Sequence, residues 1–189
     1  MIFPILAYGH PNLRKISEDI TPDYPDLERF IEEMFDTMYK TSGVGLAAPQ
    51  INKQIRIFVI DTTPFAEEFP ETKGFKKVFI NAQMLDEYGE EVSIDEGCLS
   101  VPGIRGEVMR FSKIKIRYQD ENFTEHVEEY EGMIARVIQH EYDHLEGILF
   151  VDHFNNLRKM RIKKKLNNIK KGEVNIDYRM IFPKKIKRR

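Results

Sequence analysis

The chain has 189 residues with 29 basic and 31 acidic side chains, and 41% of its residues are hydrophobic, as is usual for one globular domain. Its single cysteine excludes an intrachain disulfide and favours a reducing compartment, which we expect to be the cytoplasm. No run of residues is apolar for long enough to span a membrane, and the first residues do not predict a signal peptide.

The first predicted element is a helix over residues 26–40, where apolar residues recur with helical spacing before Gly43. A surface loop rich in Pro, Glu and Lys is predicted for residues 62–76. Strands are predicted around and beyond that loop, and residues 120–122 predict a hairpin turn. The predicted strands cover residues 55–61, 78–81, 104–111, 114–118 and 126–130.

A second helix is predicted where the sequence reads H-E-Y-D-H at residues 140–144. His140 and His144 lie one helical turn apart, so both imidazoles can reach one divalent ion. Met133 and Val137 share their stripe, which favours an apolar face where two buried imidazoles need partners. The alternative is an exposed helix that carries two histidines and paired charges.

A basic helix is predicted over residues 155–171, ended by Gly172 and followed by a flexible basic end after Pro183. Residues 158–189 contain 14 basic and 2 acidic side chains, whereas residues 1–157 contain 15 basic and 29 acidic ones. A segment this basic could bind a nucleic acid, or it could be a solvated helix attracted to the acidic remainder of the protein.

The order of these elements predicts an α+β fold. We expect one domain over residues 1–189, in which mostly antiparallel sheets pack around a central metal-binding helix. Residues 155–189 would add a C-terminal basic helix and tail.

A catalytic ion needs a third protein ligand and an open coordination position. The extended zincin motif is excluded because it would need a histidine where the chain has Phe150, and Cys98 is the best remaining candidate. Gly97 allows close approach of the backbone, and a thiolate is a soft ligand suited to zinc or ferrous iron. The alternative is that Cys98 is simply a small buried core residue.

Small side chains dominate residues 43–50, which read G-V-G-L-A-A-P-Q. An extended substrate backbone could lie close to such a loop while Gln50 projects its amide. Taken alone, the pattern rather favours a tight turn after the preceding helix.

Three motifs together resemble the signature motifs of the peptide deformylase family in their usual order. They are residues 43–50, E-G-C-L-S at residues 96–100 and Q-H-E-Y-D-H at residues 139–144. The likeness extends from about residue 5 to residue 150. It implies removal of the formyl group from the N-terminal formylmethionine of nascent proteins. That task would favour ribosomal RNA as the partner of the basic segment at residues 155–189.

The resemblance also implies one divalent ion, Fe(II) in the cell with Zn, Ni or Co possible in purified protein. The implied ligands are Cys98, His140 and His144. A metal-bound water would attack the formyl carbon with Glu141 as general base, while Gln50 and the backbone N–H of Leu99 would stabilise the oxyanion.

Arg136 departs from some family members, which carry an apolar residue there; its stem could line the pocket while its head reaches water. Glu96 and Arg105 are predicted to form an ion pair that holds the cysteine loop. Asp143 could orient a ligand histidine or be an exposed helix carboxylate. The predicted substrate-binding residues are Val44, Gly45, Ile94, Met133, Arg136 and Val137.

Two other classes of protein remain as alternatives. An RNA-binding protein with a structural metal would account for the basic tail, but it gives no reason for Glu141 or Gln50. A zinc protease would share the H-E-x-x-H motif but would need a different third ligand.

Overall fold

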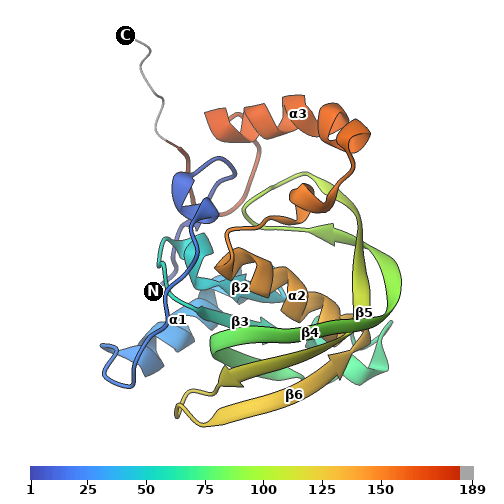
Figure 1. Ribbon diagram of the computed structural model, residues 1–189. Coiled ribbons are helices and arrows are strands. Elements are labelled where there is room, and N and C mark those ends of the chain that lie inside the picture. The colour runs from blue at the N-terminus through green and yellow to red at the C-terminus, as the bar shows by residue number, and fades with distance from the viewer. Residues whose placement is uncertain (184–189) are drawn as a thin grey trace.

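The computed structural model describes residues 1–183. Helices and strands both contribute, which confirms the predicted α+β class (Figure 1). Within the described residues, no helix combines the length and apolar composition that crossing a bilayer requires. The elements are β1 (Ile5–Leu6), α1 (Leu27–Lys40), β2 (Gly45–Ala47), β3 (Ile57–Asp61), β4 (Lys76–Gly97), β5 (Arg105–Gln119), β6 (Glu125–Glu131), α2 (Gly132–Leu145), α3 (Asn156–Lys171) and β7 (Met180–Ile181).

The main sheet is antiparallel, with the strand order β2-β3-β4-β5-β6. It curves around α2, which packs against β2, β3, β5 and β6 (Figure 1). Side chains of β5 alternate between buried and exposed, as expected of a strand with one covered face. Val108, Ile114 and Ile116 lie on the buried face. The sheet therefore supplies the apolar surface against which α2 is held.

The predicted strands were too short on β4 and β5. Residues 78–81 are only the beginning of β4, which continues for 22 residues to Gly97. Its register against β5 shifts at three places, and such irregularities bend a strand. Residues 86–91 are strongly polar and give no alternating apolar signal, so the extension was missed. The two segments at 104–111 and 114–118 form the single strand β5.

The helix predicted over residues 26–40 is confirmed as α1, whose Met34 and Met38 are fully buried. It packs on β2 and β3. The loop at residues 62–76 contains two short 3-10 helices, Thr63–Phe65 and Pro70–Thr72. The predicted hairpin turn at residues 120–122 joins β5 to β6, with the Asp120 carboxylate accepting the Asn122 N–H.

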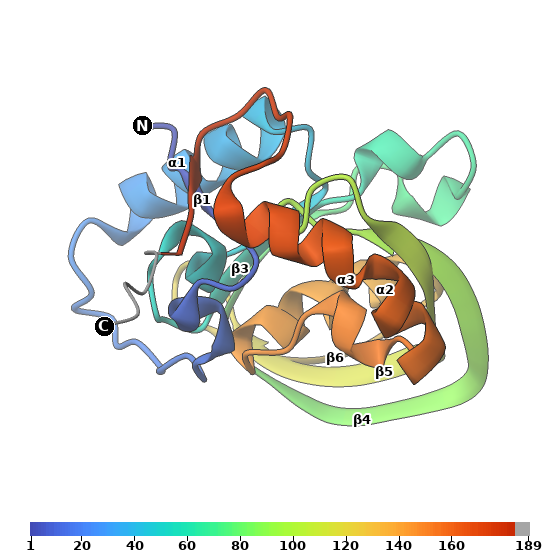
Figure 2. The same cartoon turned by 90° about the horizontal axis from the view of Figure 1, so that it is seen from above.

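The predicted basic helix is confirmed as α3. Asn155 begins it by accepting the Arg158 N–H, and Gly172 ends it with a φ of +76°. The chain then turns back and runs beside the N-terminal segment, where β7 pairs with β1 in parallel (Figure 2). Of the apolar residues of α3, Ile169 is fully buried, whereas Leu157 and Met160 face solvent. The basic end predicted after Pro183 lies outside the described residues.

Candidate metal centre and substrate pocket

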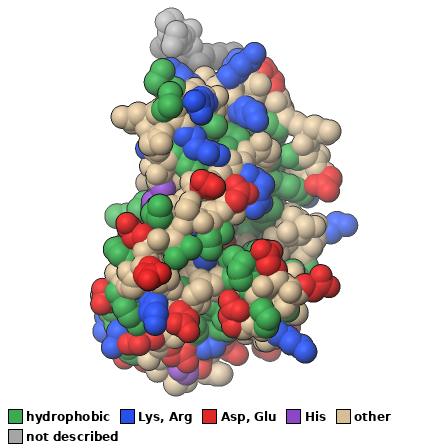
Figure 3. Space-filling model, turned by 90° about the vertical axis from the view of Figure 1, so that its right-hand side faces the viewer, with side chains coloured by type: hydrophobic (Ala, Val, Ile, Leu, Met, Phe, Trp, Pro, Cys, Tyr) green, Lys and Arg blue, Asp and Glu red, His purple; other side chains and the backbone are tan. Residues whose placement is uncertain are grey.

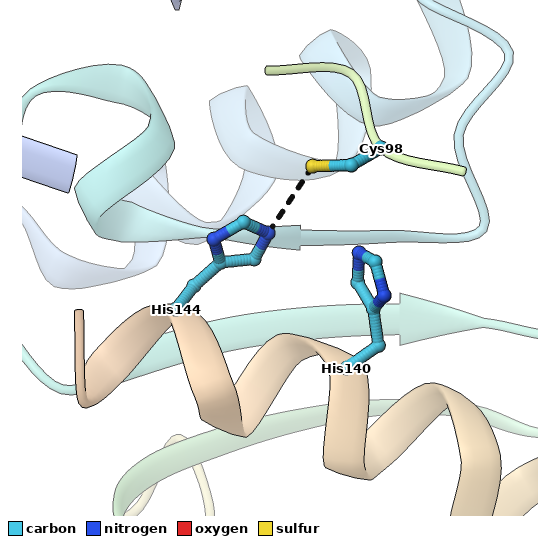
Figure 4. Close-up of side chains that lie close together, drawn as sticks. All are labelled: Cys98, His140 and His144. Atoms are coloured by element: carbon cyan, nitrogen blue, oxygen red, sulfur yellow. Dashed lines mark hydrogen bonds between the residues drawn. The ribbon is translucent and has the colours of Figure 1, made fainter. Parts of the chain in front are cut away.

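Three side chains from two parts of the chain converge on one point (Figure 4). His140 and His144 project from the same face of α2, and Cys98 lies in the turn that follows β4. Their ligand atoms all lie within 4.8 Å of one another. The Cys98 Sγ atom is 3.3 Å from Nε2 of His144. This is the arrangement that the spacing of the two histidines and the choice of Cys98 predicted.

The donor set fits a divalent ion. Metal–sulfur and metal–nitrogen bonds of about 2.3 and 2.0 Å at a tetrahedral angle separate the two donor atoms by about 3.5 Å, close to the observed distance. Burial would raise the pKa of Cys98, but the two histidines outweigh it and lower the pKa to about 5. Cys98 is therefore a thiolate at neutral pH. One thiolate and two imidazoles suit zinc or a first-row transition metal.

Glu96 orients the first histidine. Its Oε2 atom lies 2.8 Å from Nδ1 of His140, which leaves Nε2 of that ring for the ion. The carboxylate is buried and also accepts hydrogen bonds from Arg110 and Arg136. Burial would raise the pKa of Glu96, but His140 and Arg110 outweigh it and hold the pKa far below its usual range. By contrast, Nδ1 of His144 is buried with no hydrogen-bond partner among residues 1–183.

Two predictions about charged neighbours were wrong. Arg105 pairs with Asp95 at 2.6 Å, not with Glu96, because neighbouring strand residues point to opposite faces of β4. The head of Arg136 does not reach water. It is buried and donates to Glu96 and to the carbonyl of Val108.

The undecided Asp143 neither contacts a ligand histidine nor lies exposed. Its Oδ2 atom accepts from Arg110 and contacts His153, each at 2.8 Å. Arg110 also donates to Glu96, and Glu96 orients His140. Asp143 therefore supports the metal site indirectly, by fixing Arg110. No sequence motif marks Arg110, although it falls on the buried face of β5, where an arginine requires a carboxylate partner.

Glu141 is a buried carboxylate with an available oxygen. Its side chain is next to Gly45, where a Cβ atom would collide with the carboxylate. Only a glycine at that position leaves room for it. Burial raises the pKa of Glu141 to about 7. Within the described chain, Oε2 is buried without a hydrogen-bond partner, so this atom is free to accept a proton.

The Gln50 amide faces the cysteine turn. Its oxygen accepts the Ala47 N–H at 2.8 Å, which directs Nε2 toward Cys98 Sγ at 3.5 Å and Ser100 Oγ at 3.4 Å. No hydrogen bond of the described residues uses the backbone N–H of Leu99. The Gln50 amide thus lies beside the sulfur, and the unused Leu99 N–H belongs to the residue that follows Cys98.

A pocket of about 850 Å³ opens beside these groups. Cys98, His140, Glu141, Gln50 and Leu99 all contribute to its wall. So do all of the predicted substrate-binding residues. These substrate-binding residues are Val44, Gly45, Ile94, Met133, Arg136 and Val137.

The segment after α3 adds a wall that sequence analysis missed. Residues 175–178 line the pocket, and the hydroxyl of Tyr178 donates to the carbonyl of Leu99 at 2.8 Å. Burial, and then the negative charge of Cys98, raise the pKa of Tyr178. No motif marks this segment in the sequence, because its partner lies 79 residues away.

Comparisons with known proteins agree with this geometry. The family model for polypeptide deformylase matches residues 2–160. A peptide deformylase of Flavobacterium psychrophilum is 55% identical, with 98% of this chain and 100% of the relative covered. A peptide deformylase of Christiangramia forsetii is 53% identical, with 97% of each chain covered.

Solved structures agree as well. The crystal structure of peptide deformylase from Thermus thermophilus superposes with a TM-score of 0.80 at 37% identity, covering 91% of this chain and 99% of that one. A peptide deformylase from Legionella pneumophila gives a TM-score of 0.78 at 36% identity, covering 92% and 98%. From its sequence and its fold, this chain belongs to the polypeptide deformylase family.

Proposed function

We propose that this protein hydrolyses the formyl group from the N-terminal formylmethionine of nascent proteins in a metal-dependent reaction. The observation that carries the proposal is the buried carboxylate of Glu141 beside the Cys98, His140 and His144 cluster, in the wall of one pocket. Family membership supports the same reaction.

Cys98, His140 and His144 would hold one divalent ion, for which we favour Fe(II), with Zn, Ni or Co able to replace it in purified protein. When bound, such an ion supplies Lewis-acid polarisation of a carbonyl oxygen and lowers the pKa of water. Glu96 supports this role by engaging Nδ1 of His140, so that the ring cannot turn.

Glu141 is the general base in this proposal. A pKa of about 7 suits a group that must take up and release one proton near neutral pH. Its partnerless Oε2 atom would accept the proton of the attacking water and pass it to the nitrogen that leaves with the new amino terminus. Formate and a free amine are the products.

The negative charge that develops on the formyl oxygen needs donors. Gln50 Nε2 and the Leu99 N–H would supply them, because both lie at the cysteine turn and neither is used in a short hydrogen bond. The methionine side chain would contact apolar groups of the pocket wall. These are Val44, Ile94, Met133 and Val137.

The decisive experiment compares a formyl-methionyl peptide with its acetylated counterpart, using wild-type protein and Glu141→Gln. We expect cleavage of the formylated peptide only, and a loss of kcat of at least about 100-fold in the variant with its metal content unchanged. Glu131→Gln, which alters an exposed carboxylate near α2, is the matched control. Near-normal turnover by Glu141→Gln would rule out the general base.

Companion variants separate the other roles. Cys98→Ala should lose metal affinity, and Gln50→Ala should mainly lower kcat. Stoichiometric metal with no deformylation by the wild type would favour a structural ion in an RNA-binding protein. Cleavage of internal peptide bonds would favour a protease.

The ribosome is the partner we propose for the basic helix α3, and the cytoplasm is the proposed location. Lysine and arginine side chains gather in the upper part of the face in Figure 3, toward α3. Truncation before α3 would also remove residues 175–178 from the pocket wall. Charge reversal of exposed Lys163, Lys164 and Lys165 is the cleaner test. It should weaken salt-sensitive co-sedimentation with ribosomes and leave small-peptide turnover unchanged.

A further inference from the structure

The turn that carries the ligand sulfur spans residues 98–101. It is closed by one backbone hydrogen bond, from Val101 N–H to the carbonyl of Cys98 at 2.9 Å. A turn of this kind leaves its central carbonyl unpaired, and the central peptide can rotate between turn types. Because Cys98 and Leu99 line the pocket and the Ser100 hydroxyl contacts Gln50, such rotation would displace groups that the reaction needs.

Two groups from the ends of the described chain hold this turn. Tyr8 N–H donates to the carbonyl of Ser100 at 2.7 Å, and the Tyr178 hydroxyl donates to the carbonyl of Leu99 at 2.8 Å. Successive carbonyls of the turn are therefore both engaged from outside it. Neither bond is made by an element of the main sheet.

The groups that hold the turn are themselves fixed. β1 and β7 form a two-stranded sheet, in which Ile5 N–H donates to Arg179 O and Ala7 N–H donates to Ile181 O, each at 2.9 Å. Tyr178 thus lies two residues before the paired strand β7. Its ring packs against the same apolar cluster as the Leu99 side chain. The hydroxyl is therefore held in place by the packing of its ring and by the pairing of the strand that follows.

We propose that Tyr178 is a positioning residue for deformylation. By fixing the Leu99–Ser100 peptide it keeps the Cys98 sulfur, the Leu99 N–H and the Ser100 hydroxyl in the arrangement the reaction uses. This inference rests on the proposed function. It goes beyond the family match, because residues 175–178 lie outside the segment at 2–160 that the family model covers.

Tyr178→Phe tests this role, because it removes the hydroxyl and keeps the ring in its cluster. On a formyl-methionyl tripeptide at saturating metal, we expect kcat to fall on the order of five- to ten-fold, as the loss of one hydrogen bond implies. KM should stay within about two-fold, because the hydroxyl does not contact substrate in this proposal. Amide hydrogen exchange in residues 97–102 should accelerate in the variant.

The matched control is Tyr39→Phe. It removes a hydroxyl that donates to Asp61 at a distance of 2.8 Å, and neither residue lines the pocket. It should change neither kcat nor exchange in residues 97–102. A Tyr178→Phe enzyme with unchanged kcat would overturn the inference, and so would a fall in kcat without faster exchange. A rise in KM alone would also overturn it, since it would make Tyr178 a substrate contact. If the wild type itself released no formate, the proposed function would fail first.

Discussion

Glu96 and Glu128 are both carboxylates of the main sheet that contact three donor side chains, yet they occupy opposite environments. Glu96 has a side chain 5% exposed and uses both oxygens, for Arg110, Arg136 and His140. Glu128 has a side chain 36% exposed and gathers Lys77, Tyr118 and Tyr130 around one oxygen. The first lies under the metal ligands, and the second ties β4, β5 and β6 together.

The difference in burial decides whether a carboxylate also orients a metal ligand or contributes to stability alone. Without Glu96, two buried arginines and a ligand ring would lose their shared partner, and water could not replace it. Without Glu128, water could reach the lysine and the two hydroxyls. The buried cluster should therefore control metal binding, whereas the half-exposed cluster should contribute modestly to stability alone.

The largest effect is expected for Glu96→Gln. The free energy of unfolding of the metal-free protein should fall by about 3–5 kcal/mol, because buried Arg136 keeps its charge without a carboxylate partner and Arg110 keeps only Asp143. Metal affinity should fall about 10–100-fold, since the ring of His140 is no longer oriented. Urea unfolding and a metal-competition titration measure the two effects. Unchanged metal affinity would mean that Glu96, like Glu128, contributes to stability alone.

A smaller effect is expected for Glu128→Gln. Burial would raise the pKa of Glu128, but Lys77 and the tyrosine hydroxyls outweigh it and lower the pKa to about 2. A lowered pKa stabilises the folded state above the ordinary pKa, and this gain is lost as the pH falls from about 5 toward 2. Because the carboxylate is partly exposed, we expect only about 1 kcal/mol at pH 7.

The measurement is the difference in unfolding free energy between wild type and Glu128→Gln as a function of pH. The difference should shrink on acidification while deformylation at neutral pH stays unchanged. A loss of activity would contradict the separation of the two clusters.

The smallest effect is expected for Arg105→Ala. Arg105 and Asp95 are 67% and 52% exposed, so their ion pair should contribute less than about 0.5 kcal/mol. Thermal unfolding of the variant measures this contribution. A loss above about 2 kcal/mol would indicate that Arg105 belongs to the buried cluster after all.

The metal-binding and catalytic groups of the site could be predicted because they lie in short sequence motifs. Residues 140–144 fix two ligands and a carboxylate by helical spacing, and a lone cysteine leaves few candidates for the third ligand. The partners of these groups could not be predicted in the same way. Arg105 was paired with Glu96 through closeness in the sequence, whereas the register of β4 and β5 decides which residues meet.

The fold shows the same division. Helices α1 and α3 were predicted to within a residue or two, because apolar spacing and end signals act locally. The second half of β4 and the strand β7 were missed, because pairing with a distant strand determines them, not apolar alternation. The role of Tyr178 could not be predicted for the same reason, because its position depends on the pairing of β7 with β1.

The pairing of β1 with β7 has a consequence for biosynthesis. It joins residue 5 to residue 180, so the hydrogen bonds that hold the cysteine turn depend on a contact between segments that lie far apart in the sequence. A growing chain can already contain the thiol and both imidazoles and still lack those hydrogen bonds. Full competence is therefore expected to arise only after residues 178–181 have been synthesised and β7 can dock on β1.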